Sequence, residues 1–165
     1  MTPMAPTRPI RPPDPITAAA ATGPAAANGA AAGVRLRRVV RLASRLSAVS
    51  AARTEVEAAI GAWSLAVDPD VAILLTSELV TNAIAHTASG RGGKVIVTVY
   101  RGDTGVRVDV LDDGSDQAPV VHPAGEARES GFGLGLVDLM ADRWGHCGGR
   151  WSRVVWFMLG WKTNG

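Results

Sequence analysis

Three short segments decide the fold of this chain: ELVTN at residues 78–82, DDG at 112–114 and GFGLGL at 131–136. The first places a carboxylate and a carboxamide one helical turn apart. The second ends an apolar, strand-like run in an acid and a glycine, and the third places glycines just before a predicted helix. The three segments offer in turn a metal ligand, a base reader and a phosphate cradle, which together indicate an ATP site.

A helix is predicted over residues 69–87, because Asp68-Pro69 combines an N-cap acid with a proline at the first helical position. This helix is apolar over most of its circumference. A carboxylate on such a helix is costly unless it is paired, hydrated or bound to a metal. Glu78 and Asn82 therefore indicate a site, although Glu78 could instead pair with a nearby arginine and Asn82 could tie down a loop.

Residues 94–101 and 106–112 alternate and are rich in β-branched residues, and the short segment 102–105 joins them, so they predict an antiparallel hairpin. The second strand ends at Asp112. Its carboxylate could accept a hydrogen bond from an exocyclic amine, while Gly114 leaves room for a flat ring. An Asp-Asp-Gly sequence is also an ordinary turn.

Glycines at alternate positions in the third segment let the backbone approach an anion near the positive end of a helix predicted over 134–144. A glycine-rich hinge without a ligand is the alternative. The segment is not a Walker A loop, because it lacks Gly-Lys-Ser/Thr, and it does not directly follow a strand as a dinucleotide fingerprint would. The proline-broken stretch 115–130 is predicted to be a loop that serves as a lid.

The rest of the chain predicts a small globular domain behind a tail. Residues 1–33 are rich in Pro, Ala and Gly and are predicted to be a disordered tail, and the domain is predicted over 34–165. Residues 34–42 predict an edge strand, whose arginines form either a solvated strand face or a basic docking patch. Ser50 is expected to cap a helix over 51–63, and 151–159 predicts a buried central strand.

The composition narrows the classes of protein. The chain has 165 residues, 47% of them hydrophobic, a formal charge of +2 and one cysteine. These values fit one domain in a reducing compartment, and we expect a cytoplasmic protein with no membrane span, no disulfide and no direct nucleic-acid binding. The adjacent pair His146-Cys147 is a poor zinc site, and Trp144, Trp151 and Trp156 are expected to pack rather than to stack on bases.

Three longer stretches, ELVTNAIAHT, VDVLDDG and GFGLGLVDLMADRWG, resemble the N, G1 and G2 boxes of the GHKL ATPase superfamily. Over about residues 34–160, the chain is similar to the histidine-kinase-like ATPase domains of the bacterial anti-sigma factor serine/threonine kinases. The resemblance implies an α/β (α+β) two-layer sandwich, in which helices cover one face of a mixed, largely antiparallel sheet.

The resemblance also implies roles for single residues. Glu78 would be the general base toward an attacking hydroxyl, Asn82 would bind Mg²⁺ held by ATP, and Asp112 would recognise the adenine amine. The glycines and the residue implied to line the nucleotide are Gly114, Gly131, Gly133, Gly135 and Leu136.

The sequence departs from the family pattern near the start of the last strand, where the family often has a threonine. The matching stretch 152–156 offers Val154 there, with Ser152 as the nearby hydroxyl.

By resemblance, the protein would bind a sigma factor and phosphorylate an anti-anti-sigma protein on serine, with a homodimer as a further possibility. A nucleotide-sensing module that captures a partner without catalysis is the alternative. A nucleic-acid binder acting through the arginines between residues 35 and 45 ranks last.

Overall fold

The computed structural model describes residues 35–86, 92–116 and 133–161. The predicted tail and most of the predicted lid fall outside these ranges. The elements in chain order are β1 (Leu36–Ala43), α2 (Ser47–Ala62), α3 (Pro69–His86), β2 (Lys94–Arg101), β3 (Gly105–Asp112), α4 (Gly133–Met140), β4 (Arg143–Gly148) and β5 (Arg153–Gly160).

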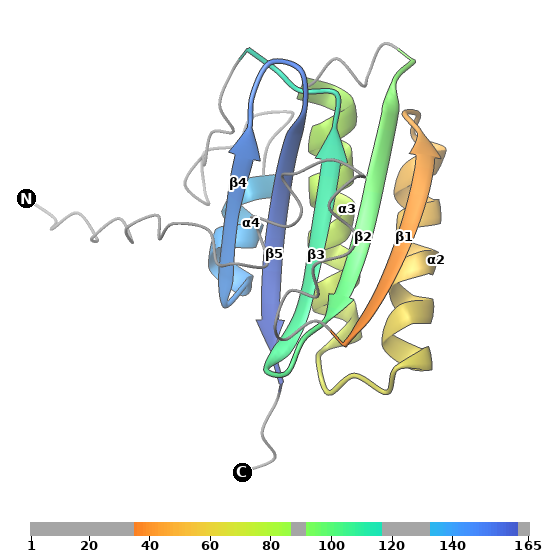
Figure 1. Cartoon of the computed structure of the whole chain (residues 1–165), viewed down its shortest axis with the longest axis vertical. Helices are drawn as coiled ribbons and strands as arrows, with labels where there is room; N and C mark the ends of the chain where they lie inside the picture. Colours follow the sequence, from red (N-terminus) through yellow and green to blue (C-terminus); the bar gives the residue numbers. More distant parts are fainter. Residues whose placement is uncertain (1–34, 87–91, 117–132, 162–165) are drawn as a thin grey trace, which may run out of the picture.

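The described part forms two layers, a sheet and a row of helices (Figure 1). The five strands are ordered β1-β2-β3-β5-β4, and each neighbouring pair is antiparallel. All three described helices lie on one face of this sheet, with α2 behind β1, α3 behind the centre and α4 behind β4 and β5. The predicted sandwich with helices on one face is therefore confirmed, and its described strand pairings are all antiparallel.

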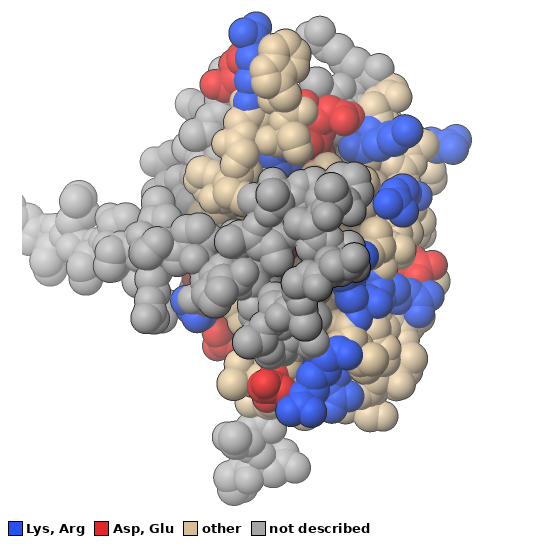
Figure 2. All heavy atoms as spheres, in the orientation of Figure 1, with Lys and Arg blue, Asp and Glu red and all other residues tan. Residues whose placement is uncertain are grey.

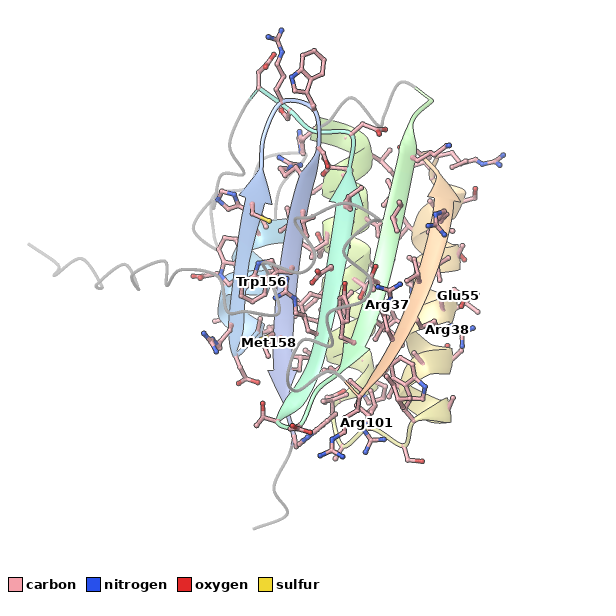
Figure 3. All side chains as sticks on the ribbon, in the orientation of Figure 1. Arg37, Arg38, Glu55, Arg101, Trp156 and Met158 are labelled. Carbon is pink, nitrogen blue, oxygen red and sulfur yellow. The ribbon has the colours of Figure 1, made fainter. Side chains whose placement is uncertain are left out.

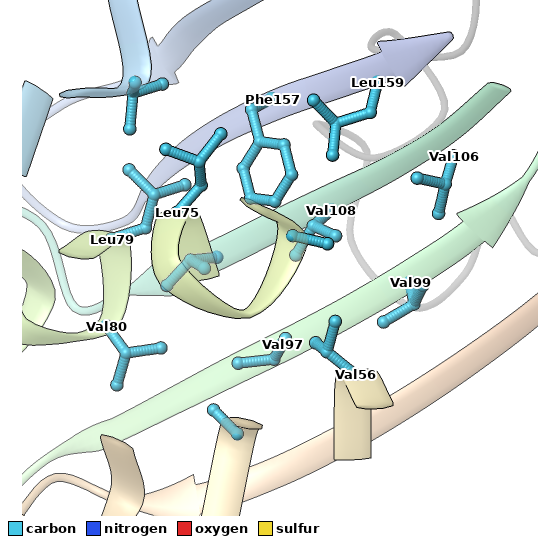
Figure 4. Packing of buried hydrophobic residues seen from close by; sticks show 14 of the residues in the cluster. Val56, Leu75, Leu79, Val80, Val97, Val99, Val106, Val108, Phe157 and Leu159 are labelled. Atoms are coloured by element: carbon cyan, nitrogen blue, oxygen red, sulfur yellow. The ribbon is translucent and has the colours of Figure 1, made fainter. Parts of the chain in front are cut away.

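The core lies between the helices and the central strands. Alternate residues of β2 and β3 point towards the helices, because successive side chains of a strand face opposite ways. Val108 and Phe157 are directly paired across β3 and β5, and both are fully buried. Figure 4 shows their side chains beneath α3, with Leu75 and Leu79 on the β5 side of that helix and Val80 on the β2 side.

Helix α3 begins as the sequence predicts. The Oδ1 atom of Asp68 accepts hydrogen bonds from the backbone N–H groups of Asp70 (3.1 Å) and Val71 (3.5 Å). An N-cap carboxylate satisfies donors that the helix itself leaves without partners. The helix is described as far as His86, and the predicted end at residue 87 lies outside the described residues.

Helix α2 differs from its prediction, because it begins at Ser47 rather than after Ser50. Leu46 is its N-cap, and no side chain caps it. Glu55 consequently lies in mid-helix instead of near the positive end, where its Oε2 atom accepts a 2.7 Å hydrogen bond from Nε of Arg38 on β1. Figure 3 shows the two side chains meeting at the β1–α2 edge.

The region after the glycine segment also differs from its prediction. Helix α4 ends at Met140, and residues 143–148 form the edge strand β4, for which we predicted no strand. Strand β5 lies between β3 and β4, so the predicted buried strand is found inside the sheet, next to the edge strand β4 rather than at the centre. The expectation that Trp151 packs is wrong, because this residue is 82% exposed in the β4–β5 turn.

The arginines at the start of the domain are partly used within the fold. Arg35 pairs with Asp103, and Arg38 pairs with Glu55. Arg37, Arg41 and Arg45 are exposed, and Figure 2 shows basic side chains gathered on the side of the molecule where β1 lies. No helix among the described residues is both long and apolar enough to cross a bilayer.

Candidate functional site

The predicted acid–amide pair lies on one flank of α3. Glu78 and Asn82 are half-buried, whereas Leu75 and Leu79 are buried. At 100° per residue, both polar side chains lie within about 60° of Leu75 around the helix axis. Because Leu75 lies on the β5 side of α3 (Figure 4), Glu78 and Asn82 lie on the flank that faces α4.

The surroundings of Glu78 disfavour the ionised form of its side chain. Burial raises the pKa of its carboxyl above the ordinary value. The arginine partner that we considered for Glu78 is not found among the described residues, where this carboxylate forms no ion pair. A carboxylate that is partly desolvated and lacks a counter-charge is a stronger base than a glutamate in water.

Asp112 lies at the end of β3, on the sheet face that the helices cover. Its Oδ1 atom accepts the backbone N–H of Gly114 at 2.8 Å. Its Oδ2 atom accepts Nε and Nη2 of Arg153 at 3.2 and 3.1 Å. Burial raises the pKa of Asp112, and the Arg153 guanidinium opposes that shift by favouring the ionised form.

Arg153 is the residue of this site that sequence reasoning missed. We assigned the departure from the family pattern to Val154, but Arg153 is paired with Asp112 in the β3–β5 register. Val155 and Phe157 alternate with Arg153 and face the core, so the period of two along β5 was the signal that places Arg153 on the same face.

Gly114 has a positive φ of 81°. A Cβ atom added to it would lie 2.4 Å from the carbonyl oxygen of Gly149 and 2.5 Å from that of Arg150. The β4–β5 turn therefore requires glycine here, which gives Gly114 a packing role beside the predicted role next to a base. The adjacent Ser115 N–H donates to the Gly149 carbonyl at 3.2 Å and fixes the same contact.

The glycine segment is described only in part. Gly131 lies outside the described residues, and α4 begins at Gly133. Within the helix, Gly135 is buried and Leu136 is half-buried against the core. The predicted cradle for phosphates at the start of this helix stays a prediction.

The described parts of the three predicted segments come from elements that pack together. Helix α3 packs against β3, which ends in the second segment, and against α4, which begins within the third. A short connection follows α3, and β2 then begins at Lys94, whose N–H donates to Asp113 at 2.8 Å. The end of α3 that carries Asn82 therefore lies at the edge of the sheet where β3 ends in Asp112 (Figure 1).

The donor set fits magnesium that arrives with a triphosphate. The described residues hold no group of three or more His, Cys, Asp or Glu that could bind a metal by itself. Mg²⁺ takes one or two protein oxygens and keeps phosphate and water for its other positions. The amide oxygen of Asn82 suits such a protein ligand position on Mg²⁺.

Among the described residues, the imidazoles and the thiol form no second metal site. His122 lies outside the described residues, and His86 is the last residue of α3. Burial lowers the pKa of His146 and raises the pKa of Cys147. A raised thiol pKa disfavours the reactive thiolate.

This fold defines a class, the α/β sandwiches with an antiparallel sheet and helices on one face. Residues 34–153 match the family described as histidine kinase-like ATPase domain. The chain belongs to this family. ATPase domains bind ATP, so family membership supports a nucleotide ligand for the site.

One solved structure extends the comparison to the fold. The chain is similar to the crystal structure of the RsbU and RsbW domains of Rv1364c from Mycobacterium tuberculosis, with a TM-score of 0.57 and 17% sequence identity. The similar region covers 75% of this chain and 31% of that chain, so this chain spans about a third of the length of its structural relative. No curated protein matches the sequence.

Proposed function

We propose that this protein is an ATP-binding regulator of the anti-sigma factor type, a serine/threonine protein kinase that phosphorylates an anti-anti-sigma partner. The proposed setting is cytoplasmic, with a sigma factor as the second partner and a homodimer as the working assembly. The family supports the nucleotide. The RsbW domain named in the similar structure supports the kind of regulator.

One observation carries the catalytic part of the proposal. Glu78 lies half-buried one turn from Asn82, with a raised pKa and no ion pair among the described residues. A merely structural glutamate on an apolar helix gains stability from a counter-charge. A base needs the reverse, a carboxylate left able to take a proton.

The proposed chemistry is a single phosphoryl transfer. The oxygen of a partner's serine bonds to the γ-phosphorus while the bond from that phosphorus to the β–γ bridging oxygen breaks, and ADP leaves. Glu78 accepts the proton of the attacking hydroxyl. Asn82 would hold Mg²⁺, which neutralises charge on the triphosphate. Asp112 would orient the adenine ring of ATP.

A transfer assay tests this proposal with labelled ATP, Mg²⁺ and candidate anti-anti-sigma proteins. Glu78→Gln keeps the size of the side chain and removes its basicity, so transfer should fall at least about 100-fold while nucleotide binding persists. Glu57→Gln is the matched control, because Glu57 is exposed on α2. Full transfer by Glu78→Gln would remove this residue from the base role.

The second candidate function is a nucleotide sensor without useful catalysis. It is favoured by the start of the last strand, where the sequence departs from the family pattern and Arg153 engages Asp112. ATP would then select a conformation that captures a partner. ATP-dependent pull-down of a partner, without transfer in any pairing, would favour the sensor over the kinase.

A further inference from the structure

The proposed base-reading end of the site contains a buried ion pair rather than a lone carboxylate. Asp112 and Arg153 are directly opposite each other in the register of β3 and β5. Their side chains are 1% and 7% exposed. The pair two positions earlier in the register, Val110 and Val155, is buried in the core, so both charged side chains lie on the face that the helices cover.

Asp112 is left with little capacity to accept a base amine. A carboxylate has about four lone-pair positions. Oδ2 holds two donors from Arg153, and Oδ1 holds the N–H of Gly114. About one acceptor position then remains, and the adjacent cation reduces its strength as an acceptor.

Arg153 adds donors at the same place. A guanidinium carries about five N–H donors, and among the described residues Arg153 directs its side-chain bonds only to Asp112. The pair therefore presents donors together with an acceptor, whereas a lone carboxylate presents acceptors alone.

This difference bears on which purine the site accepts. A carboxylate facing position 6 of a purine attracts the amine of adenine and repels the keto oxygen of guanine or hypoxanthine. A guanidinium beside that carboxylate gives the keto oxygen a charged donor. The ring N1–H of a 6-keto purine can donate to the remaining acceptor position.

We propose that Arg153 is a specificity-determining residue through which this site binds 6-keto purine nucleotides, such as GTP and ITP, at affinities comparable to that of ATP. This inference rests on the proposed nucleotide site. It does not depend on whether the protein transfers phosphate.

Calorimetric titration of the full chain tests the inference without any variant. The probes are the Mg²⁺ complexes of ATP, GTP, ITP and purine riboside triphosphate, which has no group at position 6. A charged hydrogen bond to the keto oxygen should make ITP bind at least about ten-fold more tightly than purine riboside triphosphate. ITP binding that is equal or weaker overturns the inference.

The substitution Arg153→Thr provides the second arm, because threonine suits a strand and has no cationic donor. The ratio of ATP to GTP affinity should rise at least about ten-fold in this variant. An unchanged ratio overturns the inference. If Arg153→Thr does not fold, the wild-type series above decides alone.

The two proposals fail in different ways. Binding of ATP with rejection of ITP and GTP removes the role of Arg153 and leaves the ATP-binding regulator intact. Failure of the wild-type protein to bind any of the four nucleotides removes both. Binding of ATP and ITP without phosphate transfer to any partner removes the kinase and leaves the role of Arg153 standing.

Discussion

At the scale of single residues, two carboxylates of this protein have different surroundings. Burial raises the pKa of both Glu78 and Asp112. Asp112 accepts three hydrogen bonds, two of them from the Arg153 guanidinium, so its position is fixed and a cation favours its ionised form. Glu78 has no such partners among the described residues, so its charge can change. Such a division separates binding groups from proton-transferring groups in enzymes.

Glu78→Gln should stabilise the folded protein while it removes transfer. Folding desolvates the charge of Glu78, and glutamine avoids that cost, so the melting temperature at pH 7 should rise. The wild-type carboxyl takes up a proton as the pH falls through its raised pKa, which removes the same cost. The advantage of the variant should therefore vanish in acid. Calorimetric melting at several pH values measures this, and a lower melting temperature at pH 7 would contradict it.

Arg153→Thr should destabilise the fold, because it leaves the Asp112 charge buried without its partner. Breaking a buried ion pair from one side costs about 3–5 kcal/mol. The pKa of Asp112 is already raised, and loss of the cation raises it further. The carboxyl then takes up a proton on folding at moderately acid pH, so the deficit should shrink as the pH is lowered.

Urea unfolding at pH 7 and pH 5 measures this deficit. The double variant Asp112→Asn/Arg153→Thr is the control, because it removes the buried charge as well and should recover part of the loss. A deficit in Arg153→Thr that grows towards acid pH would contradict the assignment.

The residues of the site differ in how visible they were in the sequence. Glu78, Asn82 and Asp112 could be predicted as site residues because each stands out against an apolar helix or strand. Arg153 was not found because its partner lies 41 residues away and only the register of two strands joins them. Local pattern shows which face a residue takes, and long-range pairing shows what it meets there.

At the scale of elements, the site depends on the contact between the end of β3 and the β4–β5 turn. Gly114 and Gly149 meet there through their backbones. The elements could be predicted from the sequence where the signals for a helix start or a turn are strong, as at Asp68-Pro69 and at the β2–β3 hairpin. Strand β4 was missed because Gly145 and Gly148 lower its β propensity, and its pairing with β5 supplies the order that its own residues do not.

Gly114→Ala should destabilise the protein by more than about 3 kcal/mol, since it combines a positive φ with a backbone clash. Gly92→Ala separates the two effects. Gly92 has a φ of 90° and no atom within 4 Å of an added Cβ, so it should lose only about 1 kcal/mol.

Gly61→Ala should stabilise by about 0.5–1 kcal/mol, because Gly61 lies in α2 with open space around it. Urea unfolding of the three variants gives the order. Equal losses for Gly114→Ala and Gly92→Ala would show that the contact with the β4–β5 turn is dispensable.

At the scale of the whole molecule, one sheet and one layer of helices hold all the described parts of the site. The family match begins at residue 34 and the first described strand, β1, begins at Leu36. The sheet was predictable as a type because its strands alternate clearly. The order of the strands was not predictable, because the position of β5 between β3 and β4 depends on pairing between residues far apart in the sequence.

Deletion of residues 1–33 should leave the fold and its ATP affinity intact. The melting temperature should change by no more than about 2 °C, since we predict that this segment adds no core. Melting curves and ATP titrations of the full and shortened chains measure this. A large loss in either would place the tail within the working structure.

The exposed indole of Trp151 gives the protein an optical reporter of its own. Trp151 lies in the turn that touches Gly114, and the guanidinium of Arg150 sits 5.1 Å from its ring while also pairing with Asp116 at 3.1 Å. Any ligand that disturbs the segment after Asp112 should shift this cation and alter the emission of the ring. Trp151→Phe would identify which part of the tryptophan fluorescence comes from this residue. Ligand occupancy of the site could then be followed by intrinsic fluorescence, without a label.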